Sequence, residues 1–206
     1  MKVQINYDKT NELRNIIWQS HSTWGTEKHR SDPVYCHLKA YNRRIGVESR
    51  VIGRVVEHWI VGETLHRIVQ DHFPRENIEH LVTRGNTESH IDILWDKPTE
   101  LKSTRLLVQN IRQIPTEYID QIRYGLVFLK KKEAYLGILS LSTNNLTVWD
   151  VILDKKEYIN AEHEFDTQMN VIDYAVMHRD PTVLVPKLDE CSDCSYNHSN
   201  GCYIWK

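Results

Sequence analysis

The order of hydrophobic patterns between residues 47 and 152 is the feature that most constrains the fold of this chain. From Val47 to Phe73 the apolar residues recur at helical spacing, and Pro74 follows as a helix-ending residue. Three short strand patterns come next, with turns at Gly85-Asn86 and Lys97-Pro98 between them. The strands are expected at 78–83, 88–95 and 99–104. A helix followed directly by three strands predicts a sheet packed against helices.

The remaining patterns extend this order toward both ends of the chain. Residues 8–20 can form a short helix, and residues 31–46 indicate a loop that leads into a helix. Further along we expect a helix at about 116–131, strands at 134–141 and 146–152 joined by a turn at 143–145, and a helix at about 155–179. This order predicts an α/β fold with a mixed sheet flanked by helices. No repeat or flexible linker divides the chain, so residues 1–206 are predicted to form a single domain.

Composition narrows the class of protein. The 206 residues are 40% hydrophobic and 26% charged, as in ordinary globular proteins, and the net charge of −2 excludes a general polyanion binder. No apolar run approaches the roughly 18 residues that a membrane helix needs, and the polar start lacks the apolar stretch of a signal peptide. We therefore expect a cytoplasmic protein without a membrane partner. In that compartment clustered cysteines more often bind metal than form disulfides.

Three residues of the middle strands suit metal-dependent hydrolysis of a phosphodiester. Glu100 and Lys102 are two apart in a predicted strand, so both side chains project from one face. Asp92 lies eight residues upstream in an apolar strand, where an unpaired carboxylate is costly to bury and a cation is a suitable partner. The carboxylates can hold a hard cation, and the ammonium can orient water and offset charge on phosphate.

The four cysteines form a second set. Cys191 and Cys194 have the spacing of a metal knuckle, Cys202 follows in the same polar tail, and Cys36 stands alone near the N-terminus. Four thiolates suit either a zinc ion or an iron–sulfur cluster, and residue chemistry does not separate the two. His198 is an alternative ligand.

Together these motifs resemble the RecB-like nucleases of the PD-(D/E)XK superfamily, and within them the iron–sulfur nucleases of CRISPR adaptation (the Cas "four" family). The family's Gly-Glu-x-x-His helix matches Gly62 to His66, its aspartate strand matches Asp92, and its Glu-x-Lys strand matches Glu100 to Lys102. Gln121 and Tyr124 stand where the family has a Gln-x-x-x-Tyr helix, here with one residue fewer between them. The resemblance covers residues 36–202 and includes Cys36, Cys191, Cys194 and Cys202.

The resemblance implies a restriction-endonuclease-like core and a cysteine-bound cluster region made of residues 181–206 and the loop around Cys36. His66, Asp92, Glu100 and the Leu101 carbonyl would hold Mg²⁺ or Mn²⁺. Lys102 would position water, and Gln121 and Tyr124 would arrange substrate. The four cysteines would hold a [4Fe–4S] cluster, with structural Zn²⁺ as the alternative. The substrate would be DNA, single-stranded by expectation, cut as an exonuclease, an endonuclease or both.

Other classes of function stay open. The chain could be a DNA-binding adaptor with little cleavage of its own, working with protein partners in CRISPR adaptation or, as a homologue from an archaeal virus, in viral replication inside the host cytoplasm. A redox protein is the third class, and the absence of any flavin or nucleotide motif in the sequence disfavours it. Basic residues that could guide a strand are Arg43, Arg44, Arg50, Arg54, Arg105, Arg112, Arg123 and Lys130 to Lys132.

Overall fold

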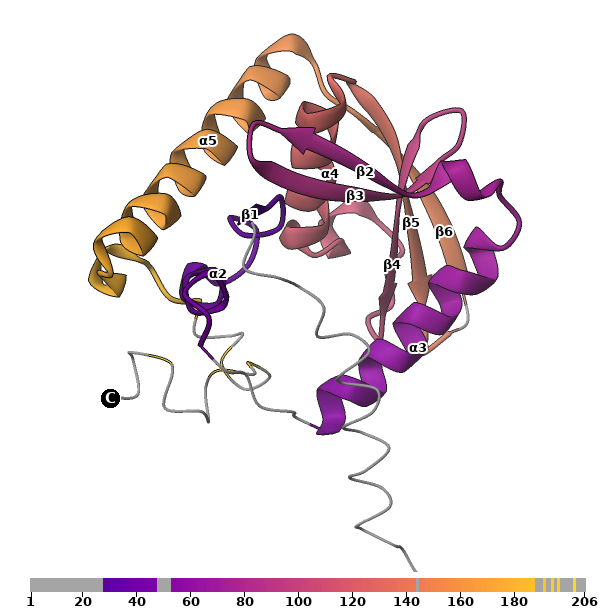
Figure 1. Ribbon diagram of the computed structural model, residues 1–206. Coiled ribbons are helices and arrows are strands. Elements are labelled where there is room, and N and C mark those ends of the chain that lie inside the picture. The colour runs from indigo at the N-terminus through magenta and orange to yellow at the C-terminus, as the bar shows by residue number, and fades with distance from the viewer. Residues whose placement is uncertain are drawn as a thin grey trace, which may run out of the picture.

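The computed structural model describes residues 28–47, 53–143 and 145–187, together with residues 191, 194, 196 and 202. Within these residues the helices and strands follow the order that the sequence predicts, apart from a two-residue strand at the start (Figure 1). The strands are β1 (Lys28–His29), β2 (Ile78–Arg84), β3 (Thr87–Leu94), β4 (Pro98–Thr104), β5 (Glu133–Ser140) and β6 (Asn145–Ile152). The helices are α2 (His37–Arg44), α3 (Gly53–Gln70), α4 (Thr116–Leu129) and α5 (Lys155–His178).

Most predicted boundaries agree with these elements to within one or two residues. The predicted helix of 47–73 stops at Gln70, because the following backbone N–H groups of His72 and Phe73 bond to carbonyls only three residues back. The predicted helix at 8–20 lies outside the described residues. Strand β1 was not predicted, because two residues carry no periodic pattern.

The six strands form one mixed sheet. Its order is β1-β3-β4-β5-β6, and β2 pairs with β3 as an antiparallel hairpin. The contacts β3–β4 and β5–β6 are antiparallel, whereas β1–β3 and β4–β5 are parallel. The parallel β4–β5 pair needs a crossover, and α4 provides it across one face of the sheet. The α/β class and the mixed sheet flanked by helices are therefore confirmed.

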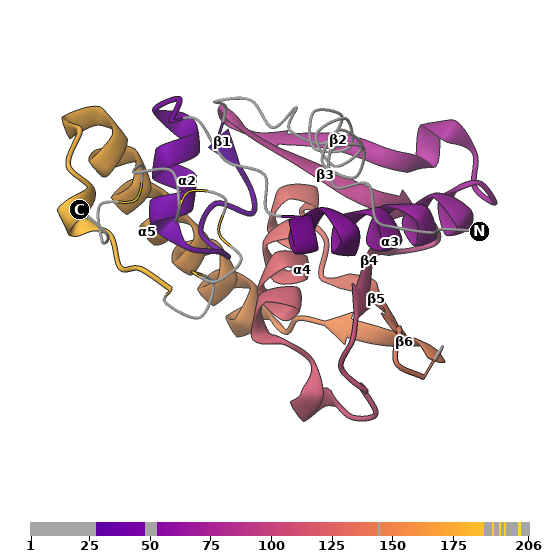
Figure 2. The ribbon, with the colours of Figure 1, turned by 90° about the horizontal axis from the view of Figure 1, so that it is seen from below.

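Helix α4 separates two hydrophobic clusters. Its Ile122 and Leu126 pack against the strands β5 and β6, while Tyr124 and Phe128 pack toward α2 and α5. Figures 1 and 2 show α5 running along the outside of this layer, with α2 beside it. A helix with two buried faces must be apolar nearly all round, and seven of the fourteen residues of α4 are buried.

Helix α3 approaches β4 on the side of the sheet opposite to α4. A Cβ placed at Gly62 would lie 3.1 Å from the Ser103 hydroxyl, and Ser103 faces away from Glu100 and Lys102 because side chains alternate along a strand. The absence of a side chain at Gly62 therefore permits the close approach of α3 to β4. Figure 2 shows α3 lying beside β4.

No described helix is long and apolar enough to cross a membrane.

A pair of substitutions on α5 tests the core. Ile172 is fully buried in the cluster between α2, α4 and α5, whereas its neighbour Val171 is 37% exposed. We expect Ile172→Ala to lower the free energy of unfolding by about 2–5 kcal/mol, because it removes buried methyl groups and leaves a cavity. Val171→Ala should change it by under about 0.5 kcal/mol. Urea denaturation measures both, and equal effects would contradict this orientation of α5.

Candidate functional site

Strand β4 places Glu100 and Lys102 on one face of the sheet. Glu100 is buried, with 3% of its side chain exposed, and Lys102 Nζ donates to its Oε1 at 2.7 Å. The carboxylate faces α4, where Ile122, Gly125 and Leu126 line a small pocket around it. The predicted same-face arrangement of the two charges is therefore present.

Asp92 reaches the same point from β3. Strands β3 and β4 pair only at Ile93–Thr99 and Leu94–Pro98, so the ladder ends just before Asp92 and Glu100 come level. Beyond that end, Asp92 Oδ2 accepts the backbone N–H of Leu101 at 2.6 Å. A side chain thus replaces the missing backbone bond, and two carboxylates stand where the strands separate.

The two carboxyl groups differ in their electrostatics. Burial raises the pKa of Asp92, and the nearby charge of Glu100 raises it further. Burial also opposes ionisation of Glu100, but Lys102 and Arg30 outweigh it and hold the pKa of Glu100 well below its usual range. Partial burial lowers the pKa of Lys102, but the carboxylates of Glu100 and Asp92 outweigh it and raise that pKa above its usual range. Of the two carboxyl groups, Glu100 therefore has the lowered pKa and Asp92 the raised one, because Lys102 offsets only part of the rise at Asp92.

Arg30 is a site residue that sequence reasoning missed. Its side chain is 2% exposed, and its Nη2 donates to Glu100 Oε2 and to the His90 carbonyl, both at 3.2 Å. It follows the two-residue strand β1, which carries no periodic signal. The signal that could have pointed to Arg30 is Gly125 in the middle of α4, because a Cβ at that position would overlap Arg30 Nη1.

Helix α3 brings His66 toward the charged cluster. His66 is half-buried; burial lowers its pKa, as does the charge of Lys102, while Glu100 and Glu79 act in the opposite direction. One helical turn later, the Gln70 amide donates to Glu79 Oε1 at 2.7 Å and to the Asp92 carbonyl at 3.1 Å. Gln70 thereby ties α3 to β2 and β3. The structure thus brings His66 into the electrostatic neighbourhood of Glu100 and Lys102.

Gln121 and Tyr124, the two predicted residues of α4, point to different places. Tyr35 donates its hydroxyl proton to Gln121 Oε1 at 3.4 Å, and burial raises the Tyr35 pKa while Lys102 lowers it. Gln121 is therefore linked to the Lys102 region through Tyr35, which sequence reasoning also missed. Tyr124 instead packs edge-on against Phe165 in the core, with ring centroids 5.4 Å apart.

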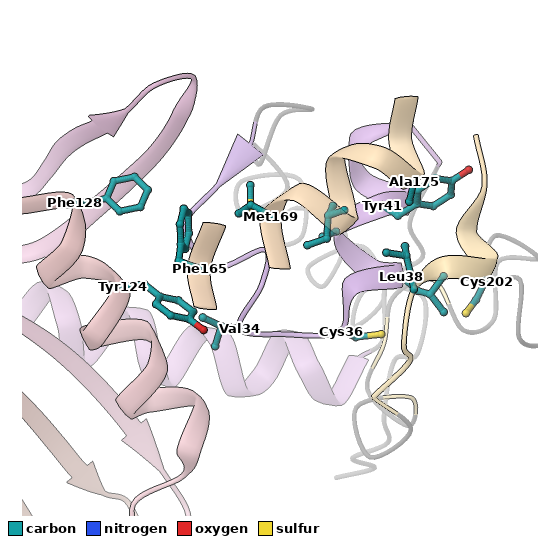
Figure 3. Packing of buried hydrophobic residues seen from close by; sticks show 13 residues of the cluster. Val34, Cys36, Leu38, Tyr41, Tyr124, Phe128, Phe165, Met169, Ala175 and Cys202 are labelled. Atoms are coloured by element: carbon teal, nitrogen blue, oxygen red, sulfur yellow. The ribbon is translucent and has the colours of Figure 1, made fainter. Parts of the chain in front are cut away.

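Two of the four cysteines, Cys36 at the start of α2 and Cys202 in the C-terminal segment, lie in one part of the fold. Cys36 and Cys202 are buried in the same hydrophobic cluster, which Figure 3 shows, and Cys194 donates its backbone N–H to the Cys191 carbonyl at 3.3 Å. His198 lies outside the described residues. Among the residues that are described, no three His, Cys, Asp or Glu side chains converge closely enough to hold a metal ion. Both metal sites therefore stay predictions.

Several of the predicted basic residues are paired with acids. Arg43 contacts Asp32 and Arg44 contacts Asp173, each at 2.6 Å. Arg123 contacts Asp120 and Glu164 at 2.9 Å. By contrast, Arg105, Arg112 and Lys130 to Lys132 are exposed. The structure does not describe Arg50 or the side chain of Arg54.

Comparison with known proteins gives a likeness of fold. No protein-family model and no curated protein matches the chain. Among solved structures, the archaeal protein SSO0001 matches with a TM-score of 0.57 and 12% identity, over 96% of each chain. The alkaline exonuclease LHK-Exo from Laribacter hongkongensis matches with TM-scores of 0.48, in complex with dAMP, and 0.47, at 12% identity over 75% of this chain and 91% of that one. The match to SSO0001 shows that the two chains share a fold.

The contact between Gly125 and Arg30 generates a stability prediction. Gly125→Ala should lower the free energy of unfolding by about 1–3 kcal/mol, because the new methyl group overlaps the buried guanidinium. Alanine in a helix interior is otherwise worth about 1 kcal/mol over glycine. The control is Gly125→Ala in an Arg30→Ala background, where the overlap is gone and the same change should be neutral or stabilising. A gain in stability in the wild-type background would refute the contact.

Proposed function

We propose that this chain is a divalent-metal-dependent DNA nuclease with a PD-(D/E)XK core. The observation that carries the proposal is the convergence of Asp92, Glu100 and Lys102 where β3 and β4 separate. Two carboxylates and an ammonium, partly removed from water, are the groups that hydrolysis of a phosphodiester requires. The resemblance of the sequence motifs to RecB-like nucleases supports the same assignment.

The donor atoms suit a hard cation. His66, Asp92, Glu100 and the Leu101 carbonyl would hold Mg²⁺ or Mn²⁺, since these ions prefer oxygen ligands and accept an imidazole. The raised pKa of Asp92 supports this, because a carboxyl group buried beside another carboxylate gains most from a nearby cation. When bound, the cation would supply Lewis acidity and a more acidic water.

The protein's own groups have separate roles in this proposal. Lys102 orients the attacking water and offsets negative charge that develops on the phosphate. Before a cation binds, Glu100 Oε1 accepts a hydrogen bond from the ammonium of Lys102 at 2.7 Å. Gln121, held by Tyr35, arranges the substrate near Lys102. Tyr124 is assigned to the core and not to the chemistry, because its ring packs on Phe165.

The proposed substrate is DNA, preferentially single-stranded. Arg105 and Arg112 are exposed in the segment between β4 and α4, directly after the strand that carries Glu100 and Lys102. Exposed guanidinium groups at that position can contact a phosphate backbone that leads to the carboxylates.

The four cysteines are proposed to bind a [4Fe–4S] cluster, with structural Zn²⁺ as the alternative. Burial of Cys36 and Cys202 in one cluster supports a shared site, and the thiol donors suit both metals. The role would be to attach the C-terminal segment to α2.

Cleavage assays test the active site. Asp92→Ala and Lys102→Ala should each lower cleavage of a single-stranded oligonucleotide at least about a hundredfold, because each removes a group from the reacting centre. Lys97→Ala is the matched control, since its ammonium pairs with Asp150 and Glu133 at the protein surface. Chelation should stop cleavage by the wild type, and Mn²⁺ should restore it. Wild-type rates in either site variant would overturn the assignment, and DNA binding without any cleavage would favour the adaptor function.

Metal content and stability test the cysteine site. Cys36→Ser and Cys194→Ser should each remove the bound metal and lower the melting temperature by about 5 °C or more, because the shared site closes a loop over most of the chain. The double variant should be no less stable than the worse single variant, since one lost ligand already opens the site. Elemental analysis and thermal melts measure both. Retained metal in the single variants, or additive losses in the double variant, would show that the cysteines do not share a site.

A further inference from the structure

Arg30 carries a fixed positive charge in an unusually enclosed position. Its side chain is 2% exposed, and within the described residues its Nε and Nη1 have no hydrogen-bond partner. Only Nη2 is bonded, to Glu100 and to the His90 carbonyl. A buried guanidinium with two unpaired donors is costly, so core packing alone gives no reason to keep it.

The two oxygens of Glu100 are bound by cations of different accessibility. Oε2 faces Arg30 at 3.2 Å, and Gly125 of α4 encloses the guanidinium on its other side. Oε1 faces Lys102, whose side chain is 15% exposed and whose neighbourhood includes His66 and Tyr35. A cation that enters from solvent therefore competes with Lys102 for Oε1, while Arg30 keeps Oε2.

The formal charges at this point balance. With both carboxyl groups ionised, Asp92 and Glu100 contribute two negative charges, and Lys102 and Arg30 contribute two positive charges. Glu79, a further described carboxylate near this cluster, is exposed to solvent, which screens its charge. A neutral cluster attracts a divalent cation less than a site with the same carboxylates and without Arg30.

We propose that Arg30 is a positioning residue that makes the site electrostatically neutral, so that a divalent cation binds well only together with a DNA phosphate. The inference rests on the proposed nuclease function. Arg30 holds Glu100 through Oε2 and leaves Oε1 as the oxygen that exchanges Lys102 for the cation. The anionic phosphate supplies the negative charge that the empty cluster lacks, so cation and phosphate favour each other's binding by the same factor.

Calorimetry with Mn²⁺ alone tests this in the full chain without DNA. Arg30→Gln removes the charge and keeps an amide donor for Glu100, so Mn²⁺ should bind about tenfold more tightly than to the wild type. Arg30→Lys keeps the charge and should stay close to the wild-type affinity. Arg84→Gln is the control outside the site, since Arg84 pairs with Asp166 and Glu162 on α5. A short thymidine oligonucleotide, measured before product forms, should tighten Mn²⁺ binding to the wild type more than to Arg30→Gln.

If the role of Arg30 is purely structural, Mn²⁺ should bind the Arg30→Gln variant either more weakly than the wild type or equally well. Either outcome overturns the inference. If Arg30→Gln fails to fold, Arg30→Lys decides, because weaker Mn²⁺ binding by this charge-retaining variant would contradict a role through charge. A different outcome would contradict the nuclease proposal itself: a wild-type protein that neither binds Mn²⁺ in the presence of DNA nor cleaves the DNA. Cleavage by the wild type with unchanged Mn²⁺ affinity in Arg30→Gln rejects the inference alone.

Discussion

The separation of β3 from β4 is the constraint on which the rest of the candidate site depends. The two strands pair at Ile93–Thr99 and Leu94–Pro98, and then the Asp92 side chain takes the N–H of Leu101 in place of a backbone carbonyl. Because the Asp92 carboxylate accepts this N–H, the two strands can separate without leaving the Leu101 N–H unpaired. An unpaired N–H would be costly at this buried position. The bond from Leu101 also fixes Asp92 beside Glu100, so one local change in pairing creates both the gap and its charge.

Helix α4 turns this gap into an enclosed site. Its sheet-facing side brings Gly125 against Arg30 and places Gln121 near Tyr35, while its outer side joins the core with Phe165. Some buried residues of α4 therefore stabilise the core, while Gly125 and Gln121 contact residues of the candidate site. A glycine in the centre of the helix weakens it, and the contact with Arg30 accounts for that choice.

The sequence predicts the parts of this structure that depend on repeated or local patterns. The helices and strands from residue 53 onward follow from apolar periodicity, and the pairing of Glu100 with Lys102 follows from strand alternation. Arg30 and Tyr35 could not be predicted, because both reach the site from the segment after β1, through contacts with residues 70 and 86 positions away. Tyr124 was placed near the substrate by its motif, but the helix turns its ring into the core. The sequence pattern predicts which residues share a face of a helix or strand, whereas tertiary packing determines which residues that face contacts.

Residues 34 to 36 connect three parts of the molecule through successive positions. The Val34 carbonyl accepts the ammonium of Lys187 from the C-terminal segment, the Tyr35 hydroxyl bonds Gln121, and Cys36 is buried with Cys202. Consecutive Cα atoms are about 3.8 Å apart, so none of these contacts can shift far without moving the others. Loss of order in the C-terminal segment would therefore displace Tyr35 and, through it, Gln121. A truncation made far from the carboxylates would then alter the position of the residue proposed to arrange the substrate.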